Sequence, residues 1–176
     1  MATAVSHHAM QAPVFEVPTR VLIVRSPYYI DIARQLVRGA QTACEAAQAM
    51  YDVVDVPGAL EIPQAIALAH GHYDGFVALG CIIRGETSHY DTVCNDSSRG
   101  LMELGLKGLC VGNGILTVEN MDQATVRADV SGQNKGGGAA VAALTLIALK
   151  RQFAKPSTAL PDGSFRIAGA PGKDVG

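Results

Sequence analysis

The chain has 176 residues, of which 48% are hydrophobic and 17% charged, and its formal charge at pH 7 is −2. This composition supports one well-buried domain, and without long lysine or arginine runs it excludes the basic surface of a nucleic-acid binder. No segment has the roughly 20 apolar residues that a membrane span requires, and the first residues lack the pattern of a secretory signal. We therefore expect a cytoplasmic protein whose partners are small molecules or other proteins.

Short β-branched runs alternate with helical patterns along the chain. In chain order, we predict strand 19–25, helix 30–50, strand 51–56, helix 60–72, strand 74–83, helix 90–104, strand 108–116, helix 119–129 and helix 135–153. Strands that alternate with helices pair in parallel through helical crossovers. The segments 1–14 and 155–176 are rich in Pro, Gly, Ser and Ala without apolar periodicity, so we predict flexible tails around a single domain over 15–154.

The edges of such a narrow sheet and the packing of its last helix suggest an assembly. A four-stranded parallel sheet has two edges that must be covered or paired, which favours an oligomer. The segment FEVP (15–18) is a candidate strand for a neighbouring subunit's sheet edge. Small residues recur on one face of the helix at 135–153, which predicts close approach of a neighbouring helix.

The cysteines are spaced too widely and irregularly for a metal-binding or redox CxxC pair. Two disulfide bridges are formally possible, but free thiols in a reducing compartment are the simpler interpretation. The four residues are Cys44, Cys81, Cys94 and Cys110.

Polar clusters follow the predicted strands at or near the points where they end. They are SPYY (26–29), PGALE (57–61), RGETSH (84–89) and GNGILTVEN (112–120). In open α/β sheets, ligands bind outside the carboxyl ends of the strands. We therefore expect four loops to line one crevice.

The RGETSH cluster leads into a predicted helix and suits a phosphate. Backbone N–H groups and the hydroxyls of Thr87 and Ser88 would lie at a helix N-terminus, where partial positive charge accumulates, and Gly85 would let an anion approach the backbone closely. A helix cap formed by Thr87 or Ser88 is an equally good interpretation of this loop alone. His89 follows directly and could serve as a general acid or base, although a lone histidine at a helix start is more often structural.

Four further residues have a structural as well as a functional interpretation. Glu61 lies at a predicted helix start, where it could stabilise the helix dipole or accept hydrogen bonds from ligand hydroxyls. Tyr28 could stack on a planar heterocycle or simply pack. Arg127 and Lys135 flank a loop, and surface charge is their ordinary role.

Four ordered motifs together resemble the 6,7-dimethyl-8-ribityllumazine synthase family across about 19–153. They are PGALEIP, GCIIRGETSHYDTVCN, GILTVENMDQATVRA and NKGGGAAVAAL. The resemblance implies a flavodoxin-like three-layer α/β fold, with a four-stranded parallel sheet of order 2-1-3-4 and helices on both faces. It also implies the penultimate step of riboflavin biosynthesis, in which 5-amino-6-(D-ribitylamino)uracil and 3,4-dihydroxy-2-butanone 4-phosphate condense without a metal or organic cofactor.

The same resemblance assigns a role to each candidate site residue. His89 would be the acid/base, and Asn113 and Arg127 would reach the site from an adjacent subunit. The residues implied for the pyrimidine and ribityl chain are Tyr28, Ala59, Leu60, Glu61, Cys81, Ile82, Ile83 and Asn113. The residues implied for the phosphate are Glu86, Thr87, Arg127 and Lys135.

Departures from the family pattern leave the assembly and the activity open to test. The run DVSGQN within 128–136 replaces the GTKAGN-like run common in sixty-subunit shells, which favours a homopentamer. Pro27 stands before Tyr28 where an arginine is common, and Asn113 occupies a position that is aromatic in some members. The rival functions are a non-catalytic lumazine- or flavin-binding paralogue and a flavodoxin-like electron carrier.

Overall fold

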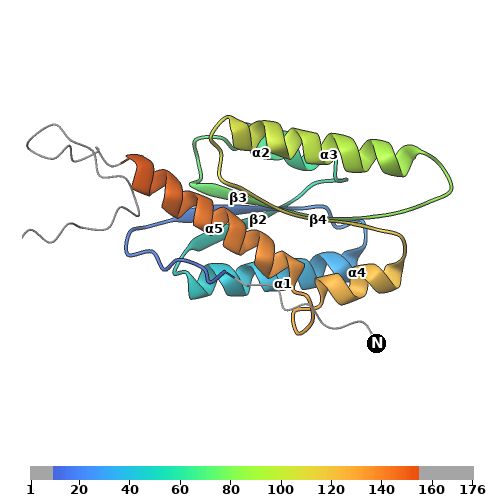
Figure 1. The fold of residues 1–176 in the computed structure, drawn as a ribbon, viewed down its shortest axis with the longest axis horizontal. Helices are drawn as coiled ribbons and strands as arrows, with labels where there is room; N and C mark the ends of the chain where they lie inside the picture. The colour runs from blue at the N-terminus through green and yellow to red at the C-terminus, as the bar shows by residue number, and fades with distance from the viewer. Residues whose placement is uncertain (1–9, 155–176) are drawn as a thin grey trace, which may run out of the picture.

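Residues 10–154 are described by the computed structural model, and their strands and helices follow the predicted order (Figure 1). The strands are β1 (Arg20–Arg25), β2 (Met50–Asp55), β3 (Gly75–Ile83) and β4 (Val111–Val118). The helices are α1 (Ile30–Ala46), α2 (Glu61–Leu68), α3 (His89–Leu106), α4 (Met121–Ala128) and α5 (Lys135–Ala154). The predicted tail 155–176 lies outside the described residues, as does 1–9, and residues 10–14 form no helix or strand. The tails and the domain range 15–154 therefore stay predictions.

The strands form one parallel sheet in the order β2-β1-β3-β4, which confirms the predicted order. Because β2 and β3 lie on opposite sides of β1, the order reverses between β1 and β3. The loops that follow these two strands diverge there and leave a crevice at the carboxyl ends of the strands.

Helices cover both faces of the sheet and produce three layers (Figure 1). α2 and α3 lie on one face, whereas α1, α4 and α5 lie on the other. Successive strand residues point to opposite faces, so Val21 and Ile23 enter one core while Leu22 and Val24 enter the other. The central strands are continuously apolar because both of their faces are covered.

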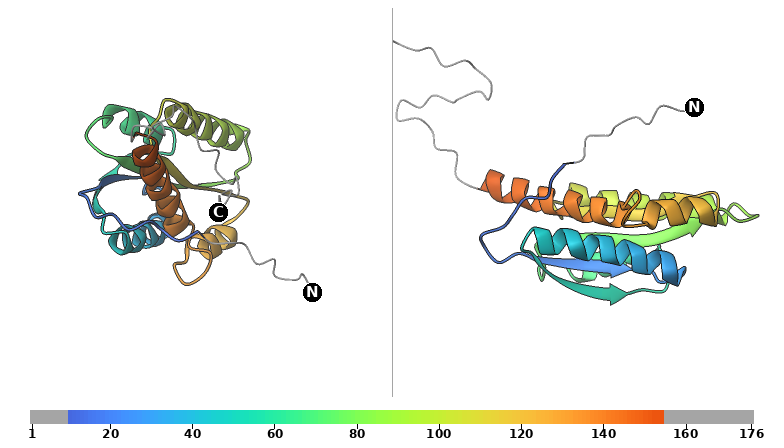
Figure 2. Two further views of the ribbon diagram at one scale, coloured as in Figure 1. Left: turned by 60° about the vertical axis from the view of Figure 1, so that its left-hand side comes forward. Right: turned by 90° about the horizontal axis from the view of Figure 1, so that it is seen from below.

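The helices α1 and α5 lie side by side beneath the sheet, as the right-hand view of Figure 2 shows. A Cβ atom on Gly136 would collide with the backbone of Leu36, so only glycine allows this separation. Ala139, Ala140 and Ala143 continue the buried face of α5. The predicted close approach of a neighbouring helix is therefore confirmed.

The outer edge of β2 is exposed in the single chain. β2 is an edge strand, and its apolar residues Met50 and Val53 are 53% and 36% exposed. An edge strand with exposed apolar residues is a favourable site for pairing with another chain. The candidate partner segment 15–18 is not a strand here. Phe15 instead packs into its own core, and its N–H donates to the Ala47 carbonyl at 3.0 Å. Pairing with a neighbour's sheet stays a prediction.

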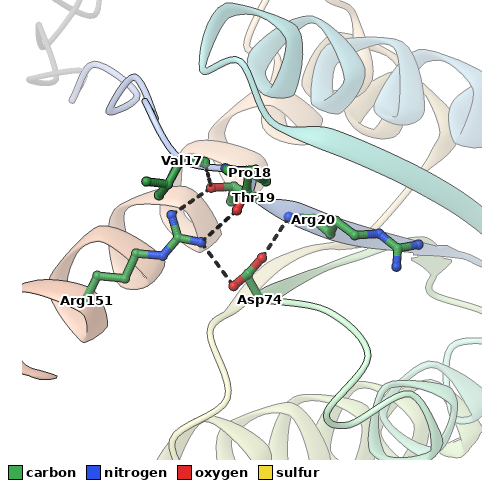
Figure 3. A network of polar contacts seen from close by, with 6 residues as sticks. All are labelled: Val17, Pro18, Thr19, Arg20, Asp74 and Arg151. Atoms are coloured by element: carbon green, nitrogen blue, oxygen red, sulfur yellow. Dashed lines mark hydrogen bonds and ion pairs between the residues drawn. The ribbon is translucent and has the colours of Figure 1, made fainter.

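A polar network at the amino ends of the strands ties α5 to the sheet (Figure 3). Arg151, in the last turn of α5, donates to the Thr19 hydroxyl at 2.7 Å and the Pro18 carbonyl at 3.3 Å, and pairs with Asp74 at 3.1 Å. Asp74 also accepts the N–H of Arg20 at 2.8 Å. One guanidinium thus connects the chain before β1, the chain before β3, and α5.

We expect Arg151→Met to lower the free energy of unfolding by about 2 kcal/mol, since the fully buried Thr19 hydroxyl loses its donor and Asp74 its ion pair. Denaturant unfolding measures the loss. The matched control is Arg38→Met, at an exposed α1 arginine with no side-chain ion pair in the described chain, and it should change stability by less than about 0.5 kcal/mol. Equal small losses in both variants would show that the network adds nothing to stability.

Candidate active site

A pocket of about 340 Å³ opens at the carboxyl ends of β1 and β3, where the strand order reverses. Its volume is in the range of small-ligand sites. Segments after β1 and β2, the end of β3 and the start of α3 line it. The lining residues are Ser26, Tyr28, Tyr29, Gly58, Ala59, Leu60, Glu61, Cys81, Ile82, Ile83, Gly85, Thr87, His89, Tyr90 and Val93.

Three of the four predicted loops line this crevice in the single chain, namely those at 26–29, 57–61 and 84–89. The cluster predicted as a loop at 112–120 is mostly strand, because β4 continues to Val118 beside β3. Its residues therefore pair with the sheet and contribute nothing to the pocket lining.

Two adjacent tyrosines after β1 form one wall of the pocket. Tyr28 is 74% exposed, so a face of its ring is open to a planar ligand. Tyr29 meets it edge to face, with ring centroids 5.1 Å apart and an interplanar angle of 71°, and itself packs against the core. Tyr29 thus supports the ring that is exposed for stacking.

Glu61 starts α2, as predicted, and lies in the wall that follows β2. Within residues 10–154 its carboxylate accepts no hydrogen bond, so both oxygens can accept from ligand hydroxyls. A Cβ atom on Gly58 would lie 2.9 Å from Glu61 Oε2, which shows that the glycine leaves space for the carboxylate. A role in stabilising the α2 dipole is compatible with the same position.

The end of β3 offers backbone groups to the pocket. β1 pairs with β3 only as far as Leu79, whose carbonyl accepts the N–H of Ser26 at 2.9 Å. Because backbone groups alternate sides along a strand, those of Cys81 and Ile83 point toward the space that β1 has left. Burial raises the pKa of the Cys81 thiol to about 11, so the thiol stays protonated near neutral pH and is a poor nucleophile.

The segment Arg84–Ser88, here called the anion loop, joins β3 to α3 without regular structure. Within the described chain, the N–H groups of Gly85, Glu86, Thr87 and Ser88 donate to no protein acceptor. Ser88 makes no side-chain cap bond, and Thr87 Oγ1 accepts the His89 N–H only at 3.4 Å. The helix-cap interpretation is therefore weak. Unpaired N–H groups at the start of an 18-residue helix favour an anion.

His89 is the first residue of α3 and lies in the pocket lining, next to the anion loop. It is exposed, and no other side chain of the described chain holds its imidazole. A structural role in the core is therefore wrong, whereas proton exchange with a ligand is sterically open.

The remaining predicted residues are outside the pocket lining of the single chain: Glu86, Asn113, Arg127 and Lys135. Glu86 is exposed in the anion loop. Because its carboxylate would repel a phosphate, Glu86 could bind one only through its backbone N–H. Asn113 lies in β4 and accepts the N–H of Ile115 at 3.0 Å.

Arg127 lies in the last turn of α4, where it donates to the Gln123 carbonyl at 3.1 Å. Lys135 is the exposed first residue of α5. In the described chain, the pocket lining therefore contains neither lysine nor arginine.

Several lining residues were missed by sequence reasoning. Val93 follows His89 by one helical turn, so a helical projection of α3 would have identified it. Tyr29 and Ser26 stand in the SPYY cluster, which was predicted to line the crevice, but neither was given a role of its own. The pocket also includes Tyr90, whose contact with Arg84 has no local sequence signal.

Within the part of the chain that the structure describes, no three His, Cys, Asp or Glu side chains group as a metal site would require. The predicted free thiols are confirmed, since all four cysteines are unbridged. None of the described helices combines the length and apolarity needed to cross a bilayer.

The fold and pocket define a flavodoxin-like α/β protein with a pocket at the carboxyl ends of its strands. The chain belongs to the 6,7-dimethyl-8-ribityllumazine synthase family, whose sequence model matches residues 18–151. This confirms the resemblance drawn from the four motifs.

Individual relatives support the same assignment. The chain is 50% identical over 168 residues to the 6,7-dimethyl-8-ribityllumazine synthase of Jannaschia sp. (strain CCS1), covering 93% of this chain and 94% of that protein. The enzyme of the same name from Methylorubrum extorquens (strain PA1) is 58% identical over 141 residues, covering 76% and 82%. The 6,7-dimethyl-8-ribityllumazine synthase 1 of Rhizobium meliloti (strain 1021) is 53% identical over 144 residues, covering 77% and 94%.

Proposed function

We propose that this chain is a transferase that forms 6,7-dimethyl-8-ribityllumazine in riboflavin biosynthesis, in the pocket at the ends of β1 and β3. The substrates are 5-amino-6-(D-ribitylamino)uracil and 3,4-dihydroxy-2-butanone 4-phosphate, and phosphate and water are released. One observation carries the proposal beyond family membership. A single pocket joins a supported aromatic ring, a free carboxylate, unpaired strand backbone and an anion loop beside His89.

The pyrimidine substrate is proposed to occupy the side of the pocket nearest β1 and β2. Its ring stacks on Tyr28, and its polar edge bonds the free backbone groups at Cys81 and Ile83, with Ile82 between them. Its ribityl hydroxyls donate to Glu61 beside Ala59 and Leu60. The protonated, buried thiol of Cys81 supports a role for backbone rather than side chain at this position.

The phosphate of the second substrate is proposed to sit on the anion loop, at the N–H groups of Glu86 and Thr87 and the start of α3. Neutral N–H groups alone leave a dianion uncompensated, and no lysine or arginine of the described residues lines the pocket. We therefore propose that Arg127 and Asn113 of an adjacent subunit complete the site, with Lys135 a weaker candidate for the phosphate.

His89 is proposed to move the protons of the reaction. The amine attacks the ketone carbon with loss of water, phosphate leaves, and ring closure follows, so protons must pass between nitrogen, oxygen and carbon at one place. Positioning two reactants supplies up to about 7–11 kcal/mol in the best model cases, and an acid/base adds about 10²–10⁴-fold. These are acid–base steps, so we propose that no metal or organic cofactor takes part.

The family is one of oligomeric enzymes that act on small molecules, and we propose a homopentamer in the cytoplasm. The exposed edge of β2, and a pocket to which residues 10–154 of the same chain contribute no lysine or arginine, support an assembly with sites between subunits. The DVSGQN run within 128–136 favours five subunits over sixty. The unbridged cysteines support a reducing compartment.

The two-substrate assay tests the activity directly. The purified chain should be colourless and should produce a fluorescent lumazine only when both substrates are present. Sizing of the active species should give the mass of five chains rather than sixty. A protein that carries visible flavin absorbance and forms no product would instead be a binding paralogue or a flavodoxin-like carrier.

We expect Gly58→Ala to raise the KM for the pyrimidine substrate by about tenfold while kcat changes little, because losing one hydrogen bond to a charged group costs about 1.5 kcal/mol. The added methyl group displaces the Glu61 carboxylate, a flexible side-chain end, so folding should be retained. The control is Gly105→Ala, where a Cβ atom meets nothing within 4 Å. An unchanged pyrimidine KM in Gly58→Ala would remove Glu61 from ribityl binding.

A further inference from the structure

We propose that Arg84 is a positioning residue that fixes the anion loop and His89 from behind the pocket. The proposal rests on the proposed function, because the loop and His89 are assigned there to the phosphate and the protons. It adds a residue that the family motif contains but to which no role has been assigned above.

Arg84 connects three elements at the base of the anion loop. Its Nε donates to Glu119 Oε2 at 2.9 Å, just beyond β4, and its NH1 donates to Asp91 Oδ1 at 3.4 Å in the first turn of α3. Its guanidinium carbon lies 4.1 Å from the centroid of the Tyr90 ring. The Arg84 N–H also donates to the Val118 carbonyl at 3.0 Å, so backbone and side chain both tie the loop to the end of β4.

Arg84 does not act as a direct phosphate ligand in this arrangement. It is absent from the pocket lining, whereas Gly85 and Thr87 are present. Two sides of its guanidinium are occupied by carboxylates and its face lies on Tyr90. One positive charge against two carboxylates leaves the group net negative, which would repel a dianion rather than bind it.

The anion loop has few other restraints. Every residue from Arg84 to His89 is exposed, so packing holds none of them firmly. Within residues 10–154 the N–H groups of Gly85 to Ser88 have no acceptor, and the loop is held at its end only by the His89 N–H on Thr87 Oγ1 at 3.4 Å and by the N–H groups of Asp91 and Thr92 on the Ser88 carbonyl at 3.0 and 3.3 Å. The Arg84 contacts therefore restrain the anion loop at both ends. At its start the loop is tied to the end of β4, and at its finish it is tied to the first turn of α3, which carries His89.

The energetics separate this role from a general structural one. Exposed ion pairs contribute little to stability, so loss of the Arg84 pairs should barely affect unfolding. A small displacement of reacting groups can lower a rate by about 100-fold. A positioning residue of this kind should therefore affect activity far more than stability.

The test compares full-length Arg84→Gln with Arg99→Gln in steady-state kinetics. Arg99 is a matched control on α3, because it is also exposed and also pairs with two carboxylates, Asp96 at 3.1 Å and Glu103 at 3.2 Å, but does not line the pocket. We expect Arg84→Gln to lower kcat/KM for the butanone phosphate by about 10- to 100-fold. The KM for the pyrimidine should stay within about twofold and the melting temperature within about 2 °C of the parent, because the pyrimidine wall and the core are untouched.

Two further variants separate geometry from charge. Arg84→Lys should stay well below the parent, because an ammonium keeps the charge but lacks the planar fork that spans two carboxylates. Arg84→Gln/Glu119→Gln removes one of the two carboxylates that the first change leaves unpaired, and it should remain impaired. Full recovery in the double variant would show that Arg84 only neutralises Glu119 and would overturn the proposal. Parent-like kinetics in Arg84→Gln would overturn it as well.

An activity-independent measurement distinguishes failure of this proposal from failure of the proposed function. Amide hydrogen exchange at Asp91 and Thr92 should accelerate in Arg84→Gln but not in Arg99→Gln, because the first turn of α3 loses its anchor. If the parent chain forms no lumazine, the proposed function fails. Whatever the activity, unchanged exchange at these two amides in Arg84→Gln would overturn the anchoring role.

Discussion

His89→Ala is expected to lower kcat by about 100-fold at saturating substrate, with little change in either KM. The imidazole lies in the pocket beside the anion loop, and no hydrogen bond from the described part of the chain holds it, so its loss removes a proton carrier and leaves the binding contacts in place. A positioned acid/base is worth about 10²–10⁴-fold, and the low end applies because an amine and a ketone condense readily on their own. Initial rates of lumazine fluorescence measure the effect.

The matched control for this variant is His72→Ala. His72 is exposed in the turn after α2 and lies outside the pocket lining, so its loss should leave kcat unchanged. Parent-like turnover in His89→Ala would remove His89 from the mechanism. A large rise in both KM values would instead indicate that His89 binds substrate.

Arg127→Ser is expected to raise the KM for the butanone phosphate by about 10- to 100-fold, since a charge-assisted hydrogen bond contributes about 1.5–3 kcal/mol and 1.4 kcal/mol is tenfold. The KM for the pyrimidine should change little. Among residues 10–154 the Arg127 side chain bonds only the Gln123 carbonyl, so stability should be nearly unaffected. Unchanged dependence on the butanone phosphate would contradict its role.

Mixing the two variants tests whether the site is shared between subunits. After dissociation and reassembly, a mixture of His89→Ala and Arg127→Ser chains should recover activity, because some interfaces then combine an intact His89 with an intact Arg127. Each variant taken alone through the same treatment is the control. If mixing restores nothing while the oligomer reforms, both residues must act within one chain.

Much of the fold could be predicted from the sequence because local signals agree with the global arrangement. Alternating strand and helix patterns predicted the parallel sheet, and the family resemblance supplied its order, which the structure confirms. Boundaries were less certain. The helix predicted over 30–50 ends at Ala46, because Gln48 adopts a positive φ of 57° that turns the chain into β2. Nothing in a glutamine signals that conformation.

The site was predictable where strand ends determine position and unpredictable where it depends on contacts between distant segments. Glu61 and His89 were placed correctly at helix starts, because the PGALEIP motif ends in a proline, which a helix accepts only in its first turn, and the RGETSH run leads into the next helix. Support of Tyr28 by Tyr29 and the link from Arg84 to Glu119 depend on how separate loops meet. The roles of all site residues stay predictions until the variants are measured.

The position of the Arg151 network also affects how this protein can evolve. Its contacts hold the amino ends of the strands, whereas the anion loop and the tyrosine wall stand at the opposite ends. Substitutions in the exposed anion loop therefore leave the Arg151 contacts intact. Such a separation lets new specificities arise without sacrificing a foldable scaffold.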